Sequence, residues 1–183
     1  MSLRFAYNTN GLQSHRLGDA IDFLGEVGYH GVALTLDPCH LDPLEAGPSL
    51  IAGVGRRLRQ ARLACVIETG GRFLLDPRRE ELPELRLTLD VAHVSVCAEE
   101  GTPPEALRAE ASHLTLVHLE DAPARVHEHL PLGEGDLDLP ATLAALVELN
   151  FQSLVAVELS RHSHAAHELV PETLAKLKAA LPS

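Results

Sequence analysis

The sequence predicts an α/β protein in which helices cover a parallel sheet. Two observations support this prediction: short apolar runs alternate with segments of helical periodicity, and most of the runs are continuously apolar. Six runs are expected to be strands, over residues 3–8, 32–36, 64–67, 87–89, 114–117 and 154–157. The chain has 183 residues and no linker-like tract, so we expect a single domain, 1–183, of six strand–helix units.

The predicted helices follow from apolar residues that recur every three or four positions. The first covers residues 17–27 and stops at Gly28, a residue type typical of helix ends. Others are expected around residues 50–61, 104–111, 143–149 and 174–181. Residues 77–85 leave room only for a short helix, broken at Pro83.

The composition argues against several classes of function. The formal net charge of −11 repels phosphate backbones and only 3% of residues are aromatic, so nucleic acid is not a favoured partner. Three widely separated cysteines form neither a disulfide framework nor a CxxC zinc motif. No apolar run approaches the ~20 residues of a membrane span and the amino terminus lacks a signal-peptide pattern, so we expect a cytoplasmic protein.

Polar side chains follow every predicted strand. In parallel α/β proteins, ligands and catalytic groups gather at the carboxyl ends of the strands, so these side chains are expected around one mouth. Taken singly, a strand-end Asp is more often a helix cap or a turn residue, and a strand His is more often a core residue. In chain order the group comprises Asn8, Asn10, Asp37, His40, Glu68, Asp90, His93, His118, Glu120, Asp121 and Glu158.

Taken together, these strand-end groups predict a metal site. Carboxylates crowded at one mouth repel and raise each other's pKa, and a divalent cation relieves that repulsion. Mixed imidazole and carboxylate ligands suit zinc, manganese, cobalt or iron, whereas magnesium prefers oxygen alone. The sequence therefore predicts a divalent metal ion and leaves its identity open among Mn, Zn, Co and Mg.

A second polar cluster follows the fifth predicted strand. It contains Arg125, His127 and His129, and an H-x-H pair on an extended segment places both imidazoles on the same side. Gly133 and Gly135 allow the backbone to turn sharply beside it. A solvated loop with a glycine turn explains this segment equally well.

The order of these residues resembles the xylose isomerase-like barrel superfamily. That group includes sugar-phosphate isomerases and epimerases, ketose 3-epimerases and endonucleases that act at abasic sites in DNA. The resemblance is carried by Asp90-x-x-His93, His118, His127-x-His129 with the Gly-Glu-Gly loop, and Glu158. It implies a parallel (βα) barrel of the TIM type, truncated to about six βα units because two further units are missing between residues 70 and 86.

The resemblance also implies metal ligands. In the epimerase branch one divalent metal is held by an Asp, a His and two Glu residues, which correspond here to Asp90, His118, Glu158 and a Glu of a missing unit. In the endonuclease branch a His matching His93 and a pair matching His127-x-His129 also bind metal.

The first hypothesis on function is a metal-dependent sugar (phosphate) isomerase or epimerase that transfers a proton next to the carbonyl of a small carbohydrate-like substrate. Glu158 is expected to move a proton on one face, and the opposite base is expected from Glu68 or from another subunit. His93 is the remaining catalytic candidate, and it also matches a substrate-contacting His of the epimerases. The substrate-binding candidates are Arg125, Asn8 and His40.

Two alternatives stay open. One is a non-catalytic, degenerate barrel that dimerises, because six units cannot close like eight and an open parallel edge favours aggregation unless it is covered or paired. A homo-oligomer, most simply a two-fold dimer across the gap between the third and fourth strands, would cover it. The other is a metal-dependent phosphodiesterase related to the abasic-site endonucleases.

Overall fold

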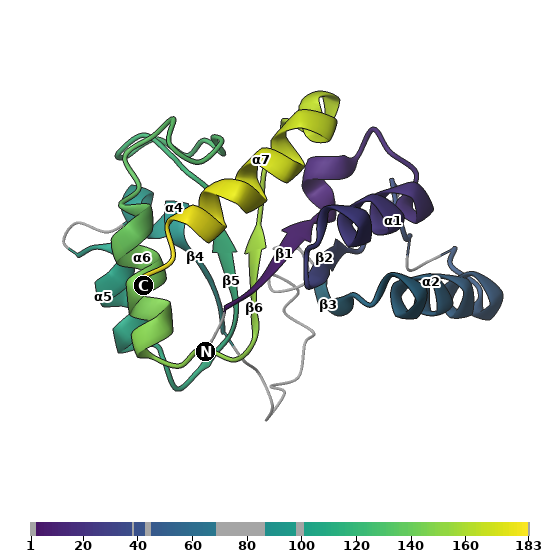
Figure 1. The fold of residues 1–183 in the computed structure, drawn as a ribbon, viewed down its shortest axis with the longest axis horizontal. Helices are drawn as coiled ribbons and strands as arrows, with labels where there is room; N and C mark the ends of the chain where they lie inside the picture. The colour runs from purple at the N-terminus through teal and green to yellow at the C-terminus, as the bar shows by residue number, and fades with distance from the viewer. Residues whose placement is uncertain (1–2, 38, 43–44, 69–86, 98–100, 183) are drawn as a thin grey trace, which may run out of the picture.

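The computed structural model describes residues 3–37, 39–42, 45–68, 87–97 and 101–182. Six strands form one parallel sheet in the order β3-β2-β1-β6-β5-β4, which curls into a half-barrel with β3 and β4 at its edges (Figure 1). The strands are β1 (Arg4–Asn8), β2 (Gly31–Thr35), β3 (Ala64–Glu68), β4 (Leu87–Asp90), β5 (Leu114–Leu119) and β6 (Leu154–Val157). The six predicted strands and the truncated TIM-type α/β fold are therefore confirmed.

The helices flank the sheet at both ends and along one side (Figure 1). α1 and α2 pack together beside β2 and β3, whereas α5 and α6 pack together at the opposite end. The helices are α1 (Leu17–Val27), α2 (Pro48–Ala61), α4 (Val91–Cys97), α5 (Pro103–Ala109), α6 (Leu139–Glu148) and α7 (Ala166–Ala179), with 3-10 turns η1 (Thr9–Leu12) and η2 (Ser163–Ala165). None of the described helices combines the length and apolar character needed to cross a bilayer.

The predicted helix ends reflect local chemistry. α1 stops at Gly28, whose φ of 96° is left-handed and whose N–H donates to the carbonyl of Leu24. α5 begins with a capping box formed by Thr102 and Glu105. The short helix expected over residues 77–85, and the 70–86 connection, lie outside the described residues.

The sequence did not predict α4. Its valines favour strands, and its seven residues are too few for a helical period to stand out. In the fold, Val91 and Ala92 are buried, and the Asp90 Oδ1 atom accepts a hydrogen bond from the backbone N–H of His93 at 3.0 Å. α4 therefore starts directly after β4 and carries His93 next to the strand ends.

Two apolar layers lie on opposite faces of the sheet. The larger lies between the sheet and the helices and includes Phe5, Tyr7 and Val155. The smaller lies on the inner face and consists of Ala6, Ala33, Leu116, Leu154 and Ala156. Strand side chains alternate between the two faces of a sheet, so a residue two positions after an inner residue also points to the inner face. Four of the five inner residues are followed in this way by a polar residue at the carboxyl end of the strand. These residues are Asn8, Thr35, His118 and Glu158.

Candidate metal centre

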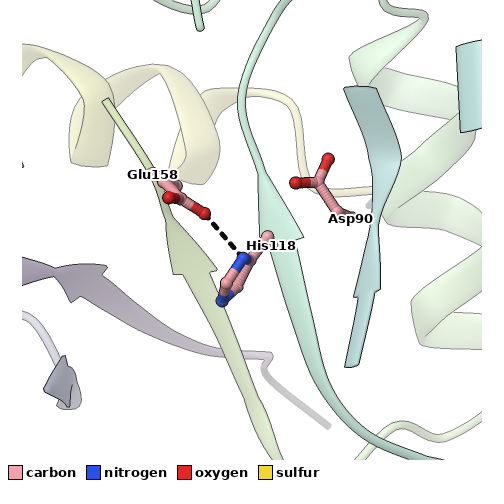
Figure 2. A group of neighbouring side chains, drawn as sticks. All are labelled: Asp90, His118 and Glu158. Carbon is pink, nitrogen blue, oxygen red and sulfur yellow. Dashed lines mark ion pairs between the residues drawn. The ribbon is translucent and has the colours of Figure 1, made fainter. Parts of the chain in front are cut away.

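Asp90, His118 and Glu158 converge at the carboxyl ends of β4, β5 and β6. Asp90 pairs with His118 across the sheet, and His118 pairs with Ala156, two residues before Glu158. Each residue offers a ligand atom, and these atoms lie within 4.8 Å of one another. Figure 2 shows the three side chains turned toward a shared space from three neighbouring strands. We call this group the inner triad.

His118 lies between two carboxylates. Its Nδ1 atom is 2.7 Å from Glu158 Oε2, and its Nε2 atom is 2.6 Å from Glu68 Oε1 (Figure 2 draws the first contact). Burial lowers the pKa of His118, but the hydrogen bonds to Glu158 and Glu68 outweigh burial and raise this pKa to about 11. Burial raises the pKa of Glu158, but its hydrogen bond with His118 outweighs that effect and lowers the pKa to about 2. Without a metal, His118 is therefore an imidazolium between carboxylates.

Amides and a hydroxyl fix these carboxylates from the other side. Asn8 donates through Nδ2 to Glu68 Oε2 at 2.7 Å, and Thr35 donates to the same oxygen at 3.4 Å. Asn10 donates through Nδ2 to Glu158 Oε1 at 2.8 Å. Each of the two carboxylates thus has one oxygen held by an amide and the other directed at His118, so the group is preorganised.

A second histidine group lies on the side of Asp90. His93 Nε2 is 2.7 Å from His127 Nε2, and the ring centroids of His127 and His129 are 5.2 Å apart. The fold therefore brings together the H-x-H pair and the histidine of α4. The His93 side chain is 52% exposed, so this pair lies at the surface of the mouth.

The remaining predicted substrate-binding residues occupy different settings. Asn8 is fully buried within the network around Glu68. Arg125 is exposed at a left-handed turn with φ of 63° in the loop after β5. The His40 side chain is fully buried, and its Nε2 lies 3.2 Å from the carbonyl oxygens of both Leu12 and His15. His40 thus faces backbone carbonyls, away from open solvent.

The sequence placed Asn10, Glu120 and Asp121 at the mouth without an individual role, and it did not single out Thr35. Thr35 could have been found, because alternation along β2 places it above Ala33 on the inner face. Asp121 holds the glycine loop: its carboxylate accepts hydrogen bonds from the N–H groups of Gly133 and Leu137, at 2.8 and 2.9 Å. A Cβ on Gly135 would lie 2.4 Å from Asp121 Oδ1, so that position needs glycine.

The inner triad fits a divalent cation by the chemistry of its donors. Two carboxylates and one imidazole are ligands that zinc, manganese and cobalt accept. They come from three rigid strand ends and are mostly shielded from water, with side chains of His118 and Glu158 only 13% and 12% exposed. Neighbouring Asn10 and Glu68 orient two of the three ligands, as outer-shell partners do in metal proteins.

The profile of the xylose isomerase-like TIM barrel family matches residues 78–180, which is more than half of the chain. The chain belongs to this family. The match covers the whole inner triad and the second histidine group. A comparison with curated proteins gave no match.

Two solved structures resemble the fold of this chain at low sequence identity, and a third shows a weaker likeness. A D-psicose 3-epimerase crystallised in the presence of D-fructose is 10% identical, with a TM-score of 0.70 over 99% of this chain and 100% of that one. An AP endonuclease of family 2 from Brucella melitensis is 12% identical, with a TM-score of 0.66 over 93% and 99%. A xylose isomerase domain protein from Planctomyces limnophilus is 22% identical, with a TM-score of 0.43 over 89% of this chain; the chain spans 62% of that protein's length.

Proposed function

We propose that this protein is a metal-dependent sugar (phosphate) isomerase or epimerase that acts by proton transfer next to a carbonyl. The observation that carries the proposal is the inner triad, whose ligand atoms lie within 4.8 Å of one another at the mouth of the half-barrel. The fold likeness to a ketose 3-epimerase agrees with it. We further propose that residues 1–183 act as one cytoplasmic domain that lacks two central units, between residues 70 and 86.

We assign Asp90, His118 and Glu158 to the metal. These residues would hold a divalent cation, which would supply Lewis-acid polarisation of a substrate carbonyl and so make the neighbouring C–H bond more acidic. Glu158 is assigned to accept the proton, since its carboxylate lies at the proposed metal position and Asn10 fixes its second oxygen.

Glu68 is assigned to hold His118. One of its oxygens accepts from His118 and the other from Asn8 and Thr35, and Glu68 lies outside the group of ligand atoms that meet within 4.8 Å. The sequence suggested proton transfer for Glu68, and its contacts favour a positioning role. The opposite base is then expected from another subunit, and the partly exposed His93 and Arg125 are proposed to orient the substrate.

The test combines elemental analysis with a turnover assay. Purified protein should hold close to one equivalent of divalent metal, and after loading with Mn²⁺, Co²⁺, Zn²⁺ or Mg²⁺ it should interconvert at least one ketose of a hexulose and pentulose panel. Glu158→Gln should lower kcat/KM at least ~100-fold with an unchanged circular dichroism spectrum. Glu26→Gln, which removes the same charge from the exposed face of α1, should leave turnover unchanged.

A second candidate is metal-dependent phosphodiester hydrolysis. It is favoured by the His93–His127 contact beside Asp90, because imidazoles that surround a carboxylate offer further metal positions. The fold likeness to an AP endonuclease agrees with it. Cleavage of an oligonucleotide with one abasic site, lost in His127→Ala and retained in Glu26→Gln, would favour this function over proton transfer.

A third proposal is a non-catalytic barrel that dimerises. It rests on the sheet edges, where Ile67 of β3 is 55% exposed and Leu87 of β4 is 37% exposed. Sedimentation of the full chain should then give twice the monomer mass, and Ile67→Glu should give the monomer. A dimer with no bound metal and no turnover would favour this reading over both enzymatic ones.

A further inference from the structure

Glu120 is a buried carboxylate that is not part of the inner triad. It directly follows β5 and lies two residues after His118, so strand alternation directs its side chain to the same inner face. Glu120 lies beyond the carboxyl end of β5, so it is closer than His118 to the mouth of the half-barrel. Strand alternation therefore places Glu120 next to the inner triad.

The burial of Glu120 is complete, with 0% of the residue exposed. Neither carboxylate oxygen accepts a hydrogen bond from an N–H or hydroxyl donor in the part of the chain that the structure describes, and a polar group next to it is another acid, Asp90. The imidazole of His129 lies beside Glu120, with its Nδ1 atom 3.5 Å from Oε1 but without the geometry of a hydrogen bond. A buried carboxylate without donors is costly, so a native fold retains it only for a compensating reason.

The neighbours of Glu120 add to this cost. The carboxyl group of Glu120 lies within hydrogen-bond reach of the Asp90 side chain, so two acidic groups meet there. Asp90 itself accepts a hydrogen bond from the backbone of α4 on its Oδ1 atom. Because Asp90 pairs with His118 across the sheet, the carboxylate of Glu120 adjoins a ligand of the inner triad, and a cation would relieve the repulsion between the two acids.

We propose that Glu120 is a fourth ligand of the cation held by the inner triad, with His129 as the partner that positions its carboxylate. This inference rests on the proposed metal site. Glu120, which directly follows β5, would be the fourth protein ligand, a place that the resemblance assigns to a Glu of a missing unit. Three carboxylates and one imidazole form an oxygen-rich set, which favours Mn²⁺ over the softer metals.

The test is Mn²⁺ binding to the full chain, measured by isothermal titration calorimetry after treatment with a chelator. Glu120→Gln should weaken Mn²⁺ binding by ~10–100-fold, because one charged ligand is lost. The same variant without metal should unfold at a temperature equal to or above that of the wild type, since a buried charge without donors has been removed. A residue with only a structural role would lower that temperature.

Two further variants keep the result decisive. Glu26→Gln changes the net charge equally from an exposed site and should bind Mn²⁺ like the wild type. Glu120→Asp keeps the charge but shortens the side chain by one methylene, so it should also bind Mn²⁺ more weakly, and it serves if the Gln variant does not fold.

Wild-type-like Mn²⁺ binding in a folded Glu120 variant would overturn the role of Glu120 and leave the inner triad intact. If the wild type binds neither Mn²⁺, Zn²⁺ nor Co²⁺, the proposed metal site fails and this inference fails with it.

Discussion

The central strands and the edge strands of this sheet have similar sequences but different surroundings. In β6, between β1 and β5, all four residues are buried. In β3, at one edge, the sequence ACVIE is just as apolar before its final Glu, yet Cys65 and Ile67 are exposed. Burial therefore follows the number of neighbouring strands and helices more than the apolar character of the strand. The inner triad combines both kinds of strand, since Asp90 comes from the edge strand β4 whereas His118 and Glu158 lie at the carboxyl ends of the inner strands β5 and β6.

The largest effect is expected from a matched pair of leucines. Leu154→Ala in β6 should lower the free energy of unfolding by ~2–5 kcal/mol, because Leu154 is 3% exposed and fills the inner layer. Leu87→Ala in β4 should cost about 1 kcal/mol or less, because Leu87 is 37% exposed. Urea unfolding followed by circular dichroism measures both. Equal losses would show that the edge strands are packed like the central ones.

Addition of metal should reduce the difference between centre and edge. A cation that binds only the folded protein stabilises it by about 2.7 kcal/mol at a hundredfold excess over Kd. Because Asp90 ends β4, amide hydrogen exchange in β4 should slow on addition of Mn²⁺ more than exchange in β3. Chelator should reverse the change. A uniform slowing in both edge strands would argue against a cation tied to β4.

Glu68 of the edge strand β3 contacts His118 and is not itself a proposed metal ligand, so its substitution should weaken metal binding less than loss of a ligand does. Glu68→Gln should weaken metal binding ~10–100-fold, about 1.4–2.7 kcal/mol, since the amide cannot hold His118 as a carboxylate does. The matched variant Asp90→Asn, which removes a proposed ligand from the other edge, should weaken it more. If Glu68→Gln is the more damaging of the two by calorimetry, Glu68 touches the metal directly.

The smallest effect concerns pH and the start of the central strand β1. His30 Nδ1 accepts a hydrogen bond from the backbone N–H of Phe5 at 3.1 Å. Burial, Lys178 and Arg4 lower the pKa of His30, so the unfolded chain binds a proton more readily than the folded one. The stabilisation is therefore complete above the ordinary pKa of 6.5 and falls as the pH decreases below it. The melting temperature of the wild type should drop slightly more between about pH 8 and about pH 5.5 than that of His30→Gln.

Much of the fold could be read from the chain, because periodicity and helix ends are local properties. The apolar run 154–157 and the glycine after residue 27 specify β6 and the end of α1 without reference to distant residues. α4 could not be read, since its valines favour a strand and only packing against the sheet makes a helix of Val91 and Ala92.

The sequence by itself determined the set of polar groups at the strand ends and the family pattern from Asp90 to Glu158. Only the tertiary structure decided which of them share a site. His118 meets Glu68 across fifty positions of chain, whereas His40 turns to the carbonyls of Leu12 and His15. The physical reason is that strand register and curvature set these distances, and both depend on how all six strands pack. The sequence placed Glu120 among the strand-end groups, but only the packed structure shows that no described N–H or hydroxyl group donates to its carboxylate.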